Sequence, residues 1–389
     1  MMSGRSNAKA PRGAFRPLLA GALLLAVAAA QSAAQPLIRH TDLQAVDENG
    51  LSAWDGPLPF RIRGVILNNP EERLDPTARF IPWDNGAGVF QLGGQWEIFI
   101  QAVDPGDRGG TACWMGQNYG NLPWLHSSDL SYSDAAWEAE MARLNHDPAT
   151  GRQFRAGDLV EALARRSLFY GGKRNVNEAH DISPEADFEL ILVQADYGLP
   201  EPELVWLKDL VRPDDGDPDT HEDIFDPTRA TGGEHWQGML VCLRDVRLAD
   251  ASGWNQEAWD ARRCVVTDGE GRFFPIRMPR RDMGPAPEGT FSPIGILDQN
   301  ASGSDGTFGY ELFVIALAPR LSVQVGADGE AILSWPKSAR YFGLEACSSL
   351  EEGDWQPAGL SPEEKADRWE VRIEPEAARR FYRLRWTGR

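Results

Sequence analysis

The amino-acid sequence predicts an all-β protein in which one short helix interrupts a long series of strands. Short runs alternate apolar and polar residues, as in Phe60-Arg-Ile-Arg63 and Trp96-Glu-Ile-Phe-Ile-Gln101, and such alternation is typical of half-buried strands. Turn signals such as Gly171-Gly172 and Asp268-Gly269 separate the runs. The chain is therefore expected to fold into sheets joined by short turns.

The N-terminal 34 residues have the layout of a secretory signal peptide. Four basic residues precede an apolar run from Leu18 to Ala30, and the small residues Ala33-Ala34 follow it. The run has about 13 residues, fewer than the roughly 20 that a membrane-crossing helix needs. We therefore expect residues 1–34 to be a signal peptide and the protein to be secreted or periplasmic, without a membrane span.

The composition is strongly acidic. With 58 acidic against 39 basic residues, the chain has a formal charge of −19 at pH 7. Such a surface keeps a protein soluble and opposes the approach of a polyanion. Nucleic acid would have to bind at a local basic surface, and basic residues do gather in two stretches: Arg152, Arg155, Arg165, Arg166, Lys173 and Arg174, and then Arg272, Arg277, Arg280 and Arg281.

Residues 35–199 predict a first unit of strands with an inserted helix. Ser133 can cap a helix over Asp134 to Leu144, because apolar residues recur within that segment at helical spacing. The segment 157–170 fits either a strand or a helix. Strands are expected at 60–67, 96–101 and 187–194, and after Gly109-Gly110.

Residues 200–235 are rich in proline and aspartate and predict an acidic, solvated linker. Asp215, Asp217 and Asp219 alternate as the ligands of a calcium loop do. Thr220, however, occupies the position at which such a loop needs glycine. The linker is the preferred interpretation, and calcium binding by this segment stays open.

Two further β units are expected after the linker. Residues 236–319 predict five strands, at 238–248, 263–267, 272–277, 289–297 and 310–317, and residues 320–389 predict a small β-sandwich of evenly spaced short strands. Cys242 and Cys264 lie in consecutive strands of the second unit. They are either a disulfide or two buried thiols.

The segments Phe60-Arg-Ile-Arg-Gly-Val-Ile66, Trp96–Gln101 and Gly157-Asp-Leu-Val160 with Tyr170-Gly-Gly-Lys173 resemble OB-fold modules of secreted bacterial proteins, including those attached to extracellular nucleases. Gln237–Val246 and Val265-Val-Thr-Asp-Gly269 resemble the same module a second time. The C-terminal residues around Trp335, Phe342–Glu345, Trp355 and Phe381–Leu384 resemble immunoglobulin- or fibronectin-like modules.

The resemblance implies a specific all-β architecture: two OB-like β-barrels, the first with a short inserted helix, and a small C-terminal β-sandwich. It implies no particular activity, because OB barrels serve many unrelated functions. The sequence contains no GxSxG, HExxH, P-loop or dinucleotide-binding motif, and none of its six histidines pairs with another at metal-ligand spacing. We therefore expect a non-catalytic protein without a cofactor or metal site.

The densest polar stretch outside the acidic segment runs from Lys173 to His180, directly after Tyr170 and a Gly-Gly turn. Its side chains can present donors and acceptors to a ligand, although the asparagines can instead stabilise turns. Trp114 and Tyr119 can add stacking surfaces to this stretch. The candidate ligand-binding residues are therefore Trp114, Tyr119, Tyr170, Lys173, Arg174, Asn175, Asn177 and His180.

The chain contains fourteen tryptophans, some of which can stack on sugar rings, although tryptophan more often fills cores. The candidates for stacking are Trp83, Trp96, Trp114, Trp124 and Trp206. The expected function is therefore binding or scaffolding outside the cytoplasm, by a monomer, with an unidentified extracellular or cell-surface polymer as ligand, either a polysaccharide or a nucleic acid. The alternatives are an OB-fold nucleic-acid-binding accessory protein and an enzyme with an unrecognised site.

Overall fold

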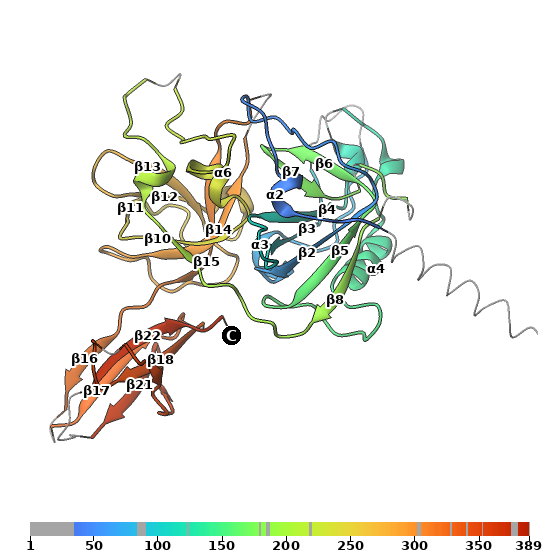
Figure 1. Ribbon diagram of the computed structural model, residues 1–389. Coiled ribbons are helices and arrows are strands. Elements are labelled where there is room, and N and C mark those ends of the chain that lie inside the picture. The colour runs from blue at the N-terminus through green and yellow to red at the C-terminus, as the bar shows by residue number, and fades with distance from the viewer. Residues whose placement is uncertain are drawn as a thin grey trace, which may run out of the picture. The chain divides into compact units, whose positions relative to one another are not determined.

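The computed structural model is predominantly β, as the sequence predicted (Figure 1). Within the described residues, no helix has both the length and the apolar character needed to cross a membrane. The expected signal peptide, 1–34, lies outside the described residues and stays a prediction. The structure describes residues 35–83, 91–122, 124–178, 180–183, 187–217, 220–301, 305–326, 329–339, 341–351, 353–374 and 380–388.

The first large sheet is formed by β1 (Leu37–Ile38), β2 (Phe60–Ile66), β3 (Gln95–Gln101), β4 (Gly110–Gly116), β5 (Leu159–Ala164), β6 (Ser167–Tyr170), β7 (Lys173–Val176) and β8 (Glu189–Gln194). Short helical segments connect them: α2 (His40–Leu43), α3 (Pro70–Arg73), η1 (Tyr119–Asn121) and η2 (Ser128–Leu130), and the longer α4 (Asp134–Leu144). The strand order is β6-β7-β4-β3-β2-β5-β8, with β1 beside β2. The segment 157–170 therefore contains strands.

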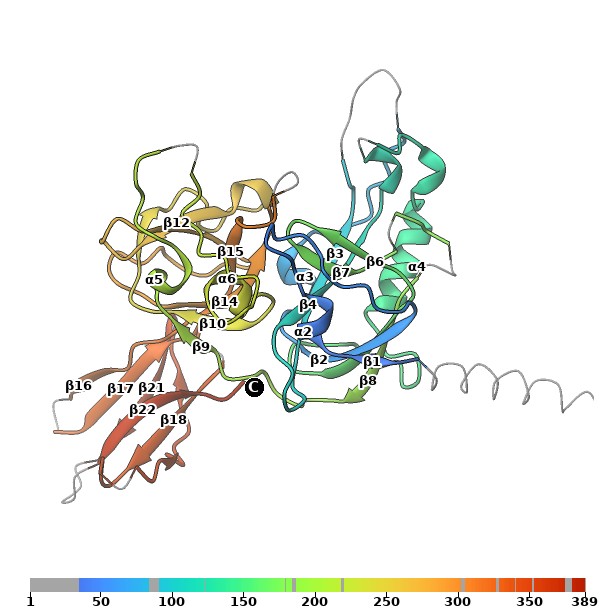
Figure 2. The same cartoon turned by 45° about the horizontal axis from the view of Figure 1, so that its top comes forward.

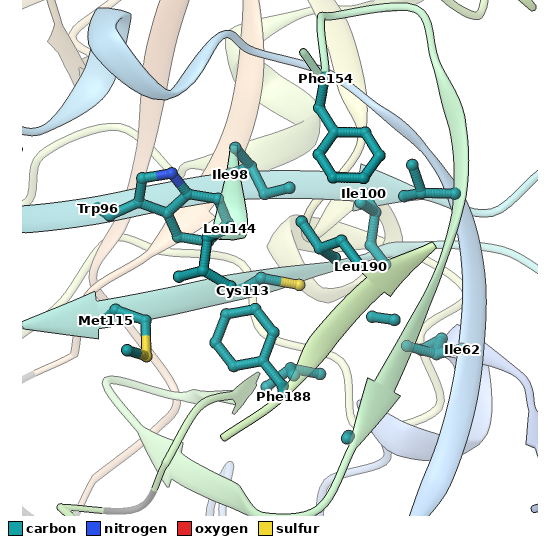
Figure 3. Packing of buried hydrophobic residues seen from close by; sticks show 14 of the residues in the cluster. Ile62, Trp96, Ile98, Ile100, Cys113, Met115, Leu144, Phe154, Phe188 and Leu190 are labelled. Atoms are coloured by element: carbon teal, nitrogen blue, oxygen red, sulfur yellow. The ribbon is translucent and has the colours of Figure 1, made fainter. Parts of the chain in front are cut away.

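Alternate side chains of the first sheet form its hydrophobic core. Trp96 and Ile98 of β3 lie beside Cys113 and Met115 of β4 in Figure 3. The predicted helix is confirmed as α4, and the Ser133 side chain accepts a hydrogen bond from the backbone N–H of Ala136 at its first turn. The apolar side of α4 packs into the same core through Trp137, Met141 and Leu144.

The second large sheet has the order β11-β12-β13-β15-β14-β10-β9. Its strands are β9 (Glu203–Val205), β10 (Leu240–Leu243), β11 (Arg247–Asp250), β12 (Arg263–Thr267), β13 (Phe273–Arg277), β14 (Pro293–Gln299) and β15 (Tyr310–Leu317), with α5 (Leu207–Leu210), α6 (Gly232–Trp236) and η3 (Trp259–Ala261) between them. β13 and β15 pair in parallel, as do β9 and β10. Asp245, between β10 and β11, has a φ of 52° and redirects the chain there.

The segment 200–235 is more than the solvated linker that its composition suggested. Its strand β9 pairs with β10, and α5 follows directly. Val205, Leu207 and Leu210 are buried in the hydrophobic core of the second sheet. The apolar residues between the prolines and aspartates are therefore enough to hold both ends of this acidic segment on the second sheet.

The C-terminal strands form two small sheets, in the orders β16-β17-β21-β20 and β19-β18-β22. The strands are β16 (Ser322–Val325), β17 (Ala331–Pro336), β18 (Phe342–Cys347), β19 (Gln356–Pro357), β20 (Glu363–Glu364), β21 (Arg368–Ile373) and β22 (Phe381–Trp386). Trp335 and Val371 of the first small sheet share a hydrophobic cluster with Leu344 and Leu384 of the second. The two sheets thus pack face to face.

The two large sheets are joined by a hydrophobic cluster of their own. Val65 and Phe99 of the first sheet pack in it with Leu240, Ile296 and Phe313 of the second. Residues 37–389 accordingly form one compact unit, and the two large sheets lie side by side in both views of it (Figures 1 and 2), with the buried cluster between them. We call this boundary, with the polar contacts around it, the sheet junction.

All four cysteines, including Cys242 and Cys264, are free and buried. Of the two possibilities that the sequence left open, the structure has buried thiols. Burial raises the pKa of both Cys242 and Cys264 to about 11, so they are protonated and unreactive at neutral pH.

At the sheet junction, the backbones of Gly110 and Gly238 approach so closely that neither has room for a side chain. A Cβ on Gly110 would lie 2.0 Å from the Gly238 carbonyl oxygen. We expect Gly110→Ala to lower the free energy of unfolding by about 1–3 kcal/mol, because overpacking must separate the two sheets. Urea denaturation measures this change.

Gly289→Ala is the matched control, because a Cβ on Gly289 meets no atom within 4 Å. This variant should unfold within about 0.5 kcal/mol of the unaltered protein. Equal urea midpoints for the two variants would show that the sheets do not dock through Gly110.

Candidate functional site

A cavity of about 760 Å³ opens at the sheet junction, and we call it the junction cavity. The first sheet and its loops form most of its wall, and the second sheet contributes η3 and the end of β14. Six of the eight predicted site residues line it: Trp114, Tyr170, Lys173, Asn175, Asn177 and His180. The remaining lining residues are Arg73, Leu74, Leu92, Gln95, Glu97, Leu122, Trp124, Leu168, Trp259, Asp260, Asp298 and Asn300.

The hairpin of β6 and β7 brings the polar stretch to this cavity. Tyr170 pairs with Lys173 across a two-residue turn, and Gly171 and Gly172 both have positive φ, at 65° and 84°. Such a turn matches the twist of the paired strands. Because side chains alternate along a strand, Lys173 and Asn175 face the cavity while Val176 enters the hydrophobic core.

The same alternation turns Arg174 away from the cavity. Its guanidinium donates to the Ser52 hydroxyl at 2.7 Å and lies 4.9 Å from the ring centroid of Trp54. Its backbone N–H donates to the Gln44 side chain. Arg174 therefore fastens the N-terminal segment to β7, and the structure does not place it among the residues that line the cavity.

Tyr119, the other predicted residue outside the lining, is fully buried behind the cavity wall. Its ring contacts that of Trp114, with centroids 6.0 Å apart, and that of His180, with centroids 5.7 Å apart. Trp124 packs on the His180 ring as well. Tyr119 thus supports two lining rings, and it offers no stacking surface of its own.

Arg73 is the central charge of the cavity floor. Its Nε donates to Glu97 of β3, and its Nη2 donates to Asp298 of β14. Lys173 forms a second ion pair with Asp298, with 2.8 Å between Nζ and Oδ1. These ion pairs link the two large sheets, because Arg73, Glu97 and Lys173 belong to the first and Asp298 to the second.

The two carboxyl groups bound by Arg73 have opposite electrostatic environments. Burial, with the Asp298 carboxylate nearby, raises the pKa of Glu97. Burial also acts on Asp298, but Lys173 and Arg73 together lower its pKa below the usual range. At neutral pH the floor therefore holds Asp298 ionised between two cations.

Several buried polar atoms of lining residues have no hydrogen-bond partner within the described part of the chain. They are Nη1 of Arg73, Oδ1 of Asn175 and Nδ1 of His180. Arg73 and Asn175 are 3% and 6% exposed. Unpaired buried polar atoms are rare in native proteins and indicate a missing partner. Burial lowers the pKa of His180, so its imidazole is neutral and can donate or accept.

The other tryptophans named as stacking candidates lie elsewhere. Trp96 is fully buried in the first core. Trp83 stacks on His126, with ring centroids 4.0 Å apart, and Trp206 lies under Arg244. Of the five tryptophans named as stacking candidates, Trp114 and Trp124 therefore line the cavity.

The basic residues considered for nucleic-acid binding are largely neutralised by carboxylates. In the first stretch the pairs are Arg152 with Asp158, Arg155 with Glu71 and Arg165 with Glu189, and in the second they are Arg272 with Asp268, Arg277 with Glu311 and Arg280 with Asp75. Such pairing leaves little positive potential for phosphates.

Two of the aspartates considered as calcium ligands, Asp215 and Asp217, are exposed. Asp215 accepts hydrogen bonds from the Asp217 backbone N–H and the Thr220 hydroxyl, while Asp219 lies outside the described residues. Carboxylate oxygens of Asp214, Asp215 and Glu222 come within 4.8 Å of one another. Exposed acidic groups of this kind are ordinary surface features, and calcium binding here stays an open question.

Sequence reasoning missed Arg73, Glu97, Trp259 and Asp298. Arg73 and Glu97 stand in segments that look like an ordinary loop and strand, and Asp298 follows them by 200 residues or more. The one available signal was a charged residue inside an apolar strand, as at Glu97 in Trp96-Glu-Ile-Phe-Ile-Gln101. A buried charge needs a partner, but the sequence does not say which.

No family model matches this chain, and a search of curated proteins finds no significant relative.

The ion pairs of Arg73 should contribute strongly to the stability of the fold. We expect Arg73→Met to lower the free energy of unfolding by about 3–5 kcal/mol, because the variant leaves Asp298 and Glu97 buried without this cation. Arg372→Met is the control. Arg372 is 52% exposed where it pairs with Glu330, so its loss should cost less than about 1 kcal/mol.

Chemical denaturation at pH 7 measures both changes. Similar losses in the two variants would mean that the Arg73 pairs contribute no more than a surface ion pair.

Proposed function

We propose that this protein is a non-catalytic, exported binding protein whose junction cavity holds part of an extracellular polysaccharide. One observation carries the proposal: exposed aromatic side chains stand at the cavity beside buried polar atoms that have no hydrogen-bond partner among the described residues. Trp124 and Tyr170 are 59% and 58% exposed, and both line the cavity with Asn175 and Arg73.

Aromatic rings and hydroxyl-binding groups are the two features that a sugar ring needs. The apolar face of a pyranose packs on a flat indole or phenol ring, and its hydroxyls require donors and acceptors at the rim. The cavity supplies rings from Trp114, Trp124 and Tyr170, and amides from Asn175 and Asn177. Mostly apolar walls with a few oriented polar groups are typical of small-ligand sites.

The charge of the cavity favours a neutral ligand over a polyanion. Two cations, Arg73 and Lys173, line the cavity together with three carboxyl groups, those of Glu97, Asp260 and Asp298. Both cations are already paired with carboxylates. A nucleic-acid strand would need an uninterrupted positive groove, so we favour the polysaccharide over the nucleic-acid alternative.

The strand pairings support the inference that both large sheets are OB-like barrels. Only residues 165–166 separate β5 from β6, and only 244–246 separate β10 from β11. If β5 and β6 are one bent strand, the first sheet closes in the order β2-β3-β4-β7-β6/β5, because β5 pairs with β2. If β10 and β11 are one bent strand, the second sheet closes in the order β11/β10-β14-β15-β13-β12, because β12 pairs with β11. The C-terminal sheets fit an immunoglobulin- or fibronectin-like sandwich in the same way.

In this interpretation the cavity lies where OB barrels bind oligosaccharides and oligonucleotides. That face is formed by the second and third strands and by the loops after the first and fourth. Here these are β3 and β4, the loop around Leu74 and Leu92, and the Gly171-Gly172 turn. Gln95, Trp114 and Tyr170 all line the cavity from those places.

The test is a binding screen of the purified protein against neutral and uronate-containing polysaccharides, followed by calorimetry on those that bind. We expect Trp124→Ala and Tyr170→Ala each to weaken binding about tenfold or more, because each removes a stacking surface worth roughly 1.4 kcal/mol or more. Trp206→Ala is the matched control, since Trp206 is an exposed tryptophan outside the cavity.

The same samples distinguish the alternatives. Polysaccharide affinity should change little between 50 and 200 mM salt, whereas binding of an oligothymidylate to a basic groove would fall steeply. Tight, salt-sensitive oligothymidylate binding would favour the nucleic-acid function. Release of reducing sugar from a bound polysaccharide would identify an enzyme, and a screen without any binding would contradict the proposal.

A further inference from the structure

Three carboxyl groups meet behind the wall of the junction cavity. Glu140 comes from α4, Glu178 from the loop after β7, and Asp187 from the residues before β8. One oxygen from each lies within 4.8 Å of the others. Glu178 is fully buried and Glu140 is 7% exposed, so water does not screen their repulsion. A buried group of three acids needs compensating positive charge.

The described cations compensate only one side of this group. Arg143 donates to both carboxylate oxygens of Glu140 and lies 3.9 Å from Asp187. Arg165 is bound to Glu189 and to the backbone carbonyl of Asp187. For Glu178, the Tyr132 hydroxyl donates to Oε1 and the Tyr119 hydroxyl is a second neighbouring donor, and no ion pair to Glu178 is found within the described residues.

Three buried oxygen atoms at this place lack a hydrogen-bond partner among the described residues. They are Oε2 of Glu178, Oδ1 of Asp187 and the hydroxyl oxygen of Tyr119. Tyr119 is itself fully buried, outside the acidic group, and its phenol lies next to Glu178. An ionised carboxylate only accepts hydrogen bonds, so these oxygens need a further donor or a cation once Glu178 and Asp187 are both ionised.

Burial and, to a smaller extent, repulsion from the neighbouring carboxylates raise the pKa of Glu178 to about 9 and that of Asp187 to about 6. Independently of these pKa values, a bound cation would offset the repulsion among the three closely spaced acids and satisfy the unpaired oxygens together.

We propose that Glu140, Glu178 and Asp187 form a binding site for a hard divalent cation of the calcium type. The donor set consists of oxygen atoms, without the nitrogen or sulfur ligands that zinc and copper favour. The Tyr119 hydroxyl adds a neutral oxygen at the edge of the site. Because Glu140 belongs to α4, and Glu178 and Asp187 stand near the two ends of the β7–β8 connection, the cation would tie α4 to both ends of that connection.

The cation site supports the cavity without depending on its ligand. Glu178 stands between Asn177 and His180, which line the cavity. Tyr119 packs against the lining rings of Trp114 and His180. Bound calcium would hold this part of the wall in place, yet its binding is measurable without any polysaccharide, so either proposal can fail alone.

The test is calorimetric titration of CaCl2 into the chelator-treated full chain, with thermal unfolding followed in parallel. We expect one saturable site with a Kd of about 1 mM or tighter and an unfolding midpoint that rises with calcium. Glu178→Gln keeps the shape and the acceptor for Tyr132 while removing the charge. It should fold, bind calcium at least tenfold more weakly and lose the thermal shift.

Glu222→Gln is the matched control, because Glu222 belongs to the exposed acidic group in the segment 200–235. This variant should bind calcium as the unaltered protein does. Asp187→Asn gives a second test of the buried site and should weaken binding in the same way as Glu178→Gln. Absence of calcium binding, or binding that depends on Glu222 and survives both buried-site variants, would overturn the proposal.

Discussion

The buried guanidinium of Arg73 joins two sheets whose chemistry would otherwise keep them apart. It holds Glu97 of the first sheet and Asp298 of the second on neighbouring N–H groups, and it lies over the rings of Phe99 and Phe313. A carboxylate buried without a cation is very costly. The two sheets can therefore approach closely only with Arg73 between them, and the hydrophobic cluster around Phe99 and Phe313 depends on that approach.

The same contact creates the junction cavity. Lys173 reaches Asp298 from the β6–β7 hairpin, and the Gly172 backbone leaves no room for a side chain beside Gln299. The hairpin is thereby held against the second sheet, and its aromatic end at Tyr170 stands at the cavity with Trp124. A site assembled across a rigid, ion-paired junction is preorganised, which lowers the entropy cost of binding.

The ion pairs show how the basic side chains of this acidic protein are used. Many of its arginines, buried and exposed, are paired with carboxylates, and the whole chain keeps a formal charge of −19. A chain of that charge suits a neutral polymer better than a polyanion. Glu178 is an exception to this pairing, because no ion pair to it is found within the described residues, and its two acidic neighbours make it the place of the proposed cation.

Residues that are close in sequence determined the secondary structure of this protein to a large extent. Alternation predicted the strands, Ser133 and the apolar spacing after it predicted α4, and Gly171-Gly172 predicted the hairpin that carries Lys173 and Asn175 to the site, because these features depend on residues close in sequence. Tertiary structure alone decided which strand face meets the cavity, and Arg174 is on the other face. It also brought Asp298 to Arg73 and Glu140 to Glu178. Those pairs depend on how separate sheets and loops pack, and apolar alternation does not encode which distant charge will neutralise a buried one.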